Sequence, residues 1–414
     1  MEDIHKIIDD INLQNLKGID SRVENALTEE QDEGALFILG ETLYQYGLIP
    51  QGLEVFRFLY HKFPNEPELL IYFVEGLIAE GETDEALEYL TEVEDTPEKL
   101  MLEADLYQQL NMLEVAIEKL NQAKMIQPED PIINFALAEL FYYDGQWLRA
   151  VTEYDTVLET GDYMINGVNL FSRIADCSLQ SGNYADAIQN YDEISDSEMT
   201  SEDYFKKSIS YEKNERTKEA ISIMKDLLTK DPDFIQGYFY LQQLYELEKD
   251  YPSAIEIGNE GLKLNQFYKE LMCQTGSLEI EHGDQNDGVD HLLESLEVDP
   301  SYHEPVLILS EFYREQDDHE ALIGLIKYVD EEDMDPVFMW HLAYAYGEEE
   351  RDKEAMHFYQ LAYQTLNDQA PFLSDYYFYL IEIGHIEEAK PILQKLKEID
   401  ATNETWFEEE DRLQ

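Results

Sequence analysis

Five carboxylates recur at nearly regular intervals in the first half of the sequence. They are Glu41, Glu75, Asp105, Glu139 and Asp176, with separations of 34, 30, 34 and 37 residues. A wall that carries one sign of charge attracts a partner of the opposite charge and speeds its association. Aromatic faces beside the acids would accept Arg or Lys cations. The neighbouring positions supply one base and several rings: Arg173, Tyr44, Tyr72, Phe135, Tyr142 and Tyr143.

Residue patterns of catalysis are missing from the sequence. It contains no Gly-rich phosphate loop, no GxSxG nucleophile turn, no HExxH helix and no CxxC pair. The string from Asp284 to Gly288 resembles a calcium loop, but its glycine comes one residue too early. Cys177 and Cys273 lie far apart, among small residues, and are expected to be buried hydrophobes. The sequence therefore predicts no enzyme, no metal site and no cofactor.

The charge composition restricts the class of partner. Lys and Arg total 28 against 92 Asp and Glu, a formal net charge of −64. This charge repels phosphate backbones and anionic membranes, so we expect no nucleic acid and no membrane insertion. The 44% hydrophobic content is too high for a disordered chain. An acidic start, and no apolar run near the roughly 18 residues of a membrane span, predict a cytoplasmic protein.

The acids belong to a repeating block of two short amphipathic helices. The block has a small residue on its first helix, a turn that often carries Gly, and a second small residue twelve positions after the first, as at Ala104 and Ala116 or Ala138 and Ala150. Pro50 and Pro252 suit the first turn of a second helix, and Pro64, Pro128, Pro232 and Pro300 end units. The predicted fold is all-α, with units that start near residues 33, 67, 97, 131, 168, 201, 235, 269, 302, 336 and 370.

This pattern resembles the tetratricopeptide repeat family over residues 33 to about 399. The resemblance implies a right-handed superhelical solenoid whose first helices line a concave, peptide-binding groove. The five acids would then face the groove in successive units. The family's cationic clamp for a C-terminal carboxylate is absent, because acids and aromatic residues hold its positions in the first five units.

Some segments depart from the pattern. The unit at 97 lacks the turn glycine, and the unit at 235 has Gly258 and Gly261 where apolar residues are expected. The unit at 302–335 fits loosely, with a register that is uncertain by one residue. Three extra residues between Gly161 and Gly167 form either a hinge or a longer surface turn. Residues 1–32 are expected to be a degenerate capping helix pair, and residues 400–414 an acidic cap or tail.

The sequence therefore predicts a non-enzymatic scaffold or adaptor that binds a partner protein or peptide, with a basic segment, in its groove. An alternative is a regulatory receptor for a small signalling peptide. We call Glu41, Glu75, Asp105, Glu139 and Asp176 the acidic column. This column has two interpretations: it is a binding wall, or it is a chance run of acids in a very acidic protein. The sequence leaves the partner and the oligomeric state open.

Overall fold

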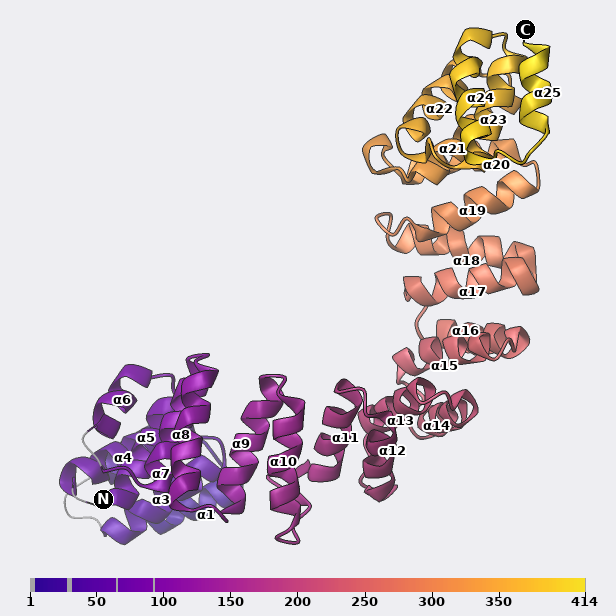
Figure 1. The fold of residues 1–414 in the computed structure, drawn as a ribbon. Coiled ribbons are helices and arrows are strands. Elements are labelled where there is room, and N and C mark those ends of the chain that lie inside the picture. Colours follow the sequence, from indigo (N-terminus) through magenta and orange to yellow (C-terminus); the bar gives the residue numbers. More distant parts are fainter. Residues whose placement is uncertain (1–3, 28–31, 65, 92–93, 414) are drawn as a thin grey trace. The chain divides into compact units, whose positions relative to one another are not determined.

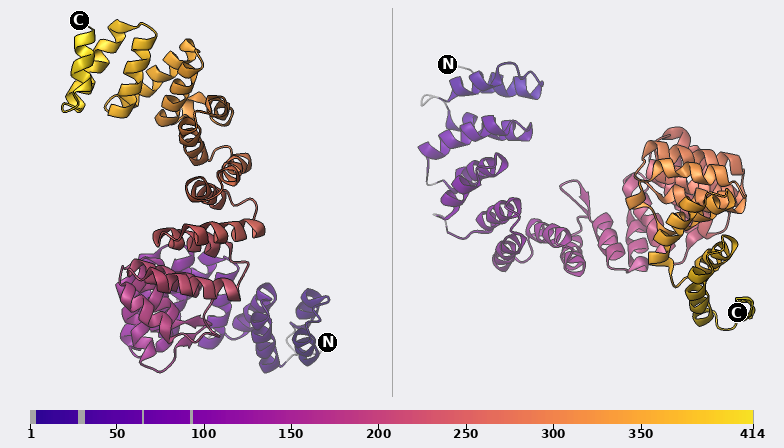
Figure 2. Two further views of the ribbon diagram at one scale, coloured as in Figure 1. Left: turned by 90° about the vertical axis from the view of Figure 1, so that its right-hand side faces the viewer. Right: turned by 90° about the horizontal axis from the view of Figure 1, so that it is seen from above.

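Paired α-helices make up the chain in the computed structural model, which describes residues 4–27, 32–64, 66–91 and 94–413. The helices contact one another mainly in sequence order (Figures 1 and 2). The all-α prediction and the repeating helix pairs are confirmed. No helix in the described ranges has the length and apolar composition needed to cross a membrane.

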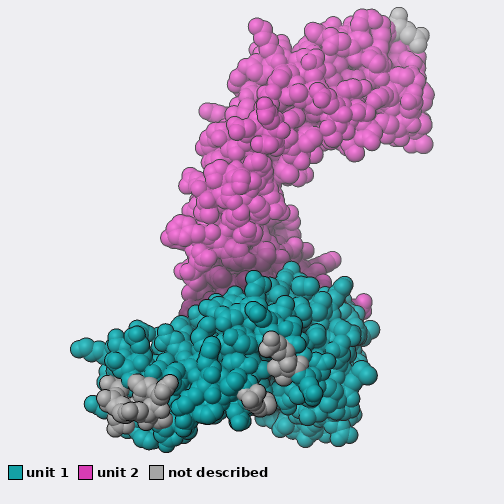
Figure 3. Space-filling model, turned by 90° about the vertical axis from the view of Figure 1, so that its left-hand side faces the viewer, with its two compact units in different colours: residues 1–199 teal, residues 200–414 magenta. Residues whose placement is uncertain are grey.

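Two compact units divide the chain, residues 1–199 and residues 200–414 (Figure 3). The described part of unit 1 contains α1 (Ile4–Asn12), α2 (Ile19–Ala26), α3 (Glu33–Gln45), α4 (Ile49–Lys62), α5 (Pro67–Ala79), α6 (Thr83–Thr91), α7 (Pro97–Gln109), α8 (Leu113–Ile126), α9 (Pro131–Tyr143), α10 (Trp147–Leu158), β1 (Met164–Ile165), β2 (Val168–Asn169), α11 (Leu170–Gln180) and α12 (Tyr184–Glu193).

Unit 2 continues the same alternation of first and second helices. Its described part contains α13 (Ser201–Lys213), α14 (Thr217–Lys230), α15 (Ile235–Leu247), α16 (Tyr251–Leu264), α17 (Lys269–His282), α18 (Gln285–Val298), α19 (Glu304–Glu315), α20 (His319–Gly324), the 3-10 turns η1 (Leu325–Tyr328) and η2 (Glu331–Asp333), α21 (Pro336–Glu348), α22 (Asp352–Leu366), α23 (Ala370–Glu382), α24 (Ile386–Ile399) and α25 (Thr405–Arg412).

Residues at the helix starts are of types that favour the first turn of a helix. The first helix of each predicted unit begins within two residues of the predicted start. Several of these helices open on proline, which suits a first turn because its missing N–H would have no partner there. In α9 the Asp130 carboxylate also accepts the Ile132 N–H at 2.8 Å. Pro50 and Pro252 lie in the first turns of α4 and α16, as the sequence predicted.

The segment around Gly161–Gly167 forms a β-hairpin. Met164 pairs with Asn169 and Ile165 with Val168. Asn166 and Gly167 have φ angles of 51° and 79°, which fit the two-residue Asn-Gly turn of tight hairpins. The chain therefore accommodates the three extra residues in a hairpin, and α11 begins directly after it at Leu170.

The loosely fitting unit at 302–335 has a shortened second helix. The helix α20 ends at Gly324, and the chain continues through η1 and η2 to α21. Leu322, Leu325 and Val329 are nevertheless buried. Leu325 and Val329 therefore enter the core from 3-10 and extended backbone, which explains the poor match of this unit to the repeat.

Both ends of the chain carry short helices. Ile4, Ile7 and Ile11 of α1 are buried in a core shared with α3, α4 and α5. At the other end, Trp406 of α25 is buried. Residues 1–3, 28–31 and 414 of the predicted caps lie outside the described residues.

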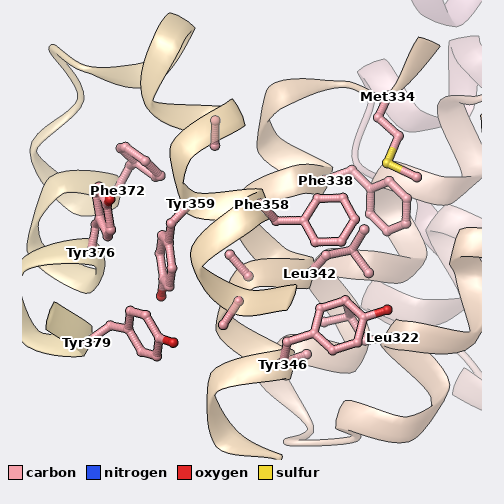
Figure 4. Packing of buried hydrophobic residues seen from close by; sticks show 14 of the residues in the cluster. Leu322, Met334, Phe338, Leu342, Tyr346, Phe358, Tyr359, Phe372, Tyr376 and Tyr379 are labelled. Carbon is pink, nitrogen blue, oxygen red and sulfur yellow. The ribbon is translucent and has the colours of Figure 1, made fainter. Parts of the chain in front are cut away.

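The core of each unit is spread along its helix pairs. In unit 2 a continuous cluster extends from Cys273 to Trp406 and is rich in rings (Figure 4). Tyr359 of α22 stacks with Tyr376 and Tyr379 of α23 at centroid distances of 4.8 and 4.9 Å. Successive pairs are therefore joined by side chains from neighbouring helices, as expected of a solenoid.

Gly258 is required by a buried polar contact. The Gln242 amide donates to the Thr275 hydroxyl at 2.8 Å and to the Ala254 carbonyl at 3.2 Å, and both side chains are 0% exposed. A Cβ on Gly258 would lie 2.2 Å from the Gln242 amide nitrogen and 2.3 Å from the Thr275 hydroxyl. A glycine in α16 lets this hydrogen bond link three successive helices.

We expect Gly258→Ala to lower the free energy of unfolding by about 1–3 kcal/mol, because the methyl group overpacks the core and displaces a buried hydrogen bond. Gly324→Ala is the control: a Cβ there has no atom within 4 Å, so a stabilisation of up to about 1 kcal/mol is expected from reduced backbone entropy. Urea titration of both variants measures the difference. Equal stability of the two variants would contradict the packing argument.

Candidate functional site in the first unit

The acidic column forms three groups between successive first helices, and the first group is aromatic. Tyr72 of α5 donates to the Glu41 carboxylate of α3 at 2.8 Å. Tyr44 donates to the Tyr72 carbonyl at 2.9 Å. The Tyr72 ring stacks on Phe56 at a centroid distance of 4.7 Å. Glu41, Tyr44 and Tyr72, three of the predicted site residues, are therefore brought together.

Two glycines leave the space that the Tyr44 side chain occupies. A Cβ on Gly52 would lie 2.4 Å from the Tyr44 ring, and one on Gly76 would lie 2.0 Å from its hydroxyl. The hydrogen bond to Glu41, with burial, raises the pKa of Tyr72 to about 12. Tyr72 therefore remains a hydrogen-bond donor at neutral pH, and the Glu41 carboxylate is held in a fixed position.

The last group of the column contains its own cation. Arg173 of α11 donates to both Glu139 oxygens of α9 at 3.0 and 3.1 Å. Tyr154 also donates to Glu139. Tyr142 donates to Asp176 at 2.5 Å, and the Arg173 guanidinium lies 4.6 Å from the Tyr142 ring centroid. The charge of Glu139 is therefore neutralised within the protein.

Glu75 and Asp105 form the middle group, which differs from the other two. Both side chains are partly exposed and partly covered by neighbouring residues, and neither forms a hydrogen bond or ion pair with a residue in the described part of the chain. Partial burial raises the pKa of Glu75, and repulsion from Asp105 raises it further. Partial burial also raises the pKa of Asp105. These two neighbouring carboxylates therefore lack a cation that would stabilise their charged forms.

The expectation that all five acids line an accessible groove is wrong for Asp176, which is only 5% exposed. The predicted ring of Phe135 is also buried, beside Tyr154 at a centroid distance of 6.3 Å. Phe135 belongs to a core cluster that includes residues of α9, α10 and α11, and Asp176 accepts a hydrogen bond from Tyr142, which packs against that cluster. Tyr143, by contrast, is 61% exposed. The sequence could not show that Arg173 reaches Glu139 across 34 residues.

Metal and thiol chemistry find no support in the described residues. They contain no group of three or more His, Cys, Asp or Glu side chains placed to hold a metal ion. Cys177 and Cys273 are buried, as predicted, and burial raises the pKa of each thiol to about 12. Thiols with such pKa values are protonated and unreactive at neutral pH.

Comparison with known proteins identifies the family. The chain is 32% identical over 389 residues to the TPR repeat-containing protein YpiA of Bacillus subtilis (strain 168), an alignment that covers 93% of this chain and 91% of that protein. The chain belongs to the tetratricopeptide repeat family. Two YpiA-like family models match it, tetratricopeptide repeats at residues 108–162 and C-terminal tetratricopeptide repeats at residues 336–400.

Solved structures of other proteins match parts of the chain at low sequence identity. The C-terminal part of a TPR repeat-containing protein from Cytophaga hutchinsonii is 14% identical, with a TM-score of 0.47, and the match covers 66% of this chain and 99% of that one. YrrB, described as a TPR protein with an unusual peptide-binding site, is 13% identical, with a TM-score of 0.37 and coverage of 46% and 96%. Tetratricopeptide repeats generally present extended surfaces for protein partners.

We expect the double variant Glu75→Gln, Asp105→Asn to be more stable than wild type at pH 7, by up to about 1 kcal/mol because water screens both groups. A carboxyl whose pKa is raised by folding destabilises the folded state above that pKa, and the penalty disappears as pH falls through it. The gain should therefore vanish in acid, which thermal melts at several pH values will show.

Glu139→Gln provides the matched control, because it changes the same column but leaves the half-buried Arg173 without its carboxylate. We expect a loss of about 1–3 kcal/mol at pH 7. If both variants shifted the melting temperature in the same direction, the division of the column into paired and unpaired acids would be wrong.

Proposed function

We propose that this chain is a non-enzymatic interaction scaffold that binds a basic segment of a partner protein along the first helices of unit 1. The observation that carries the proposal is the pair Glu75 and Asp105, two neighbouring carboxylates without a cation in the described part of the chain. A Lys or Arg from a partner would supply that cation. Binding would then relieve the repulsion from Asp105, which adds to the effect of desolvation in raising the pKa of Glu75.

The flanking groups would act as fixed walls. Tyr72 with Glu41 on one side, and Tyr142 with Arg173 on the other, are held by hydrogen bonds between successive first helices. Because these contacts exist within the protein itself, a partner would not have to order them, and less entropy would be lost on binding.

Charge supports a basic protein segment over other partners. The net charge of −64 opposes nucleic acid and anionic lipid surfaces. The same charge would steer a basic segment toward the protein, so association should be fast and salt-dependent. Both cysteines are free and buried, which agrees with the reducing cytoplasm as the place of action.

A random twelve-residue peptide library, selected on the purified protein, tests the proposal. We expect the recovered peptides to be enriched in Lys and Arg. Binding of a recovered peptide, followed by fluorescence anisotropy, should weaken about tenfold in the double variant Glu75→Gln, Asp105→Asn, mainly through slower association. Its salt dependence should also become shallower.

The control double variant Glu88→Gln, Glu118→Gln removes the same charge from exposed positions of the second helices α6 and α8. Its affinity should stay within about twofold of wild type, as expected for remote surface charges. Equal weakening in both double variants would show that only the total charge matters. Recovery of neutral or acidic peptides would reject a basic partner.

A further inference from the structure

A small hollow of about 130 Å³ lies between α21, α22 and α23 of unit 2. Its polar lining includes three carboxylates, Glu348, Asp375 and Glu382. Asp375 is already paired, because Arg314 donates to it at 2.5 Å and the Trp340 indole donates at 2.9 Å. Glu348 and Glu382 are exposed and have no ion pair within the described ranges. The hollow therefore keeps two uncompensated negative charges.

The remaining walls are aromatic. Tyr344, Tyr359, Phe378 and Tyr379 line the hollow, and Phe378 is 43% exposed. The Gly347 backbone completes the lining, and a Cβ there would lie 3.2 Å from the Tyr379 ring. A glycine within a helix lowers its stability relative to alanine. Here it leaves room beside Tyr379.

Tyr359 adds a polar group to the lining of the hollow. Its side chain is 1% exposed, yet its hydroxyl has no hydrogen bond to any residue in the described part of the chain. Figure 4 shows this hydroxyl at the end of the ring that lies toward Tyr379. The Tyr379 hydroxyl, in contrast, is bonded to the Asp352 carbonyl at 3.2 Å. Tyr359 lines the hollow, so an N–H donor placed there could bond its hydroxyl.

The protein already uses the same chemistry next to the hollow. The Arg314 guanidinium lies 4.5 Å from the Trp340 ring centroid and 5.0 Å from the Tyr344 ring centroid, while it pairs with Asp375. A planar guanidinium can stack on rings and donate to several acceptors at once, whereas an ammonium is a compact, strongly hydrated charge.

We propose that the hollow lined by Tyr344, Glu348, Tyr359, Phe378 and Glu382 binds the guanidinium group of an arginine side chain from a partner. The volume of about 130 Å³ admits one side-chain head group. Glu348 and Glu382 supply the opposite charge, the rings supply faces for stacking, and the Tyr359 hydroxyl accepts one N–H. This site lies wholly in unit 2, so it does not depend on the basic segment proposed for unit 1.

The probe is N-acetyl-L-arginine methylamide, titrated into the full-length protein and followed by ligand-observed NMR. The citrulline analogue has nearly the same shape without the charge, and the lysine analogue has the charge without the plane. We expect saturable binding of the arginine probe only. The double variant Glu348→Gln, Glu382→Gln should weaken it about fivefold to tenfold. The variant Glu256→Gln, Glu260→Gln, which changes exposed acids of α16, should leave it unchanged.

Tyr359→Phe separates a binding role from a structural one. Because the hydroxyl has no partner to lose, the melting temperature should not fall, while the affinity for the arginine probe should drop several-fold. Equal binding of the citrulline or lysine analogue would overturn the guanidinium assignment, as would the lack of saturable arginine binding. Unchanged affinity in Tyr359→Phe would overturn the role of the hydroxyl. None of these outcomes bears on Glu75 and Asp105.

Discussion

Close approach of the two helices in each pair is the constraint on which the rest of this structure depends. A helix of about 12 to 14 residues is marginal in water, so each must bury apolar surface on both its partner and its neighbours. The crossing points therefore carry small residues, such as Ala138 with Ala150. Gly276 and Gly288 lie so close that a Cβ on Gly276 would be 2.8 Å from the Gly288 carbonyl oxygen. Where a polar residue stands at this point, it bonds across it, as Ser208 does to the Ala220 carbonyl at 2.9 Å.

This constraint explains why so much of the fold could be predicted from the sequence. Small residues twelve positions apart repeat with a fixed period, and prolines mark helix starts and unit ends. Irregular segments were harder to predict. The Asn166-Gly167 pair is a hairpin signal in the sequence, whereas the repeat pattern predicts only a surface turn or a hinge at this place. Gly258 interrupts the expected apolar pattern for a reason visible only in three dimensions, its contact with Gln242 and Thr275.

The candidate site shows a sharper limit of sequence reasoning. The repeat pattern predicts that the five acids occupy one position in successive first helices. Whether each acid is paired depends on residues of another helix pair. Glu139 pairs with Arg173, and Asp176 accepts a hydrogen bond from Tyr142. Glu75, in contrast, is repelled by Asp105. The expected column thus contains both structural and unsatisfied carboxylates. The hollow beside Tyr359 was not predicted at all, because its walls come from three helices and its signal is a missing hydrogen bond.

The shortened second helix at α20 has a consequence for slow motions of the chain. Regular helices protect their amide protons through successive i to i−4 hydrogen bonds, and 3-10 turns have poorer geometry. Residues 325–333 hold apolar side chains in the core on such backbone. The side chains thus pack this segment against its neighbours, while local unfolding of its backbone requires little free energy. Hydrogen exchange would then begin within unit 2 at η1 and η2, ahead of the helices on either side.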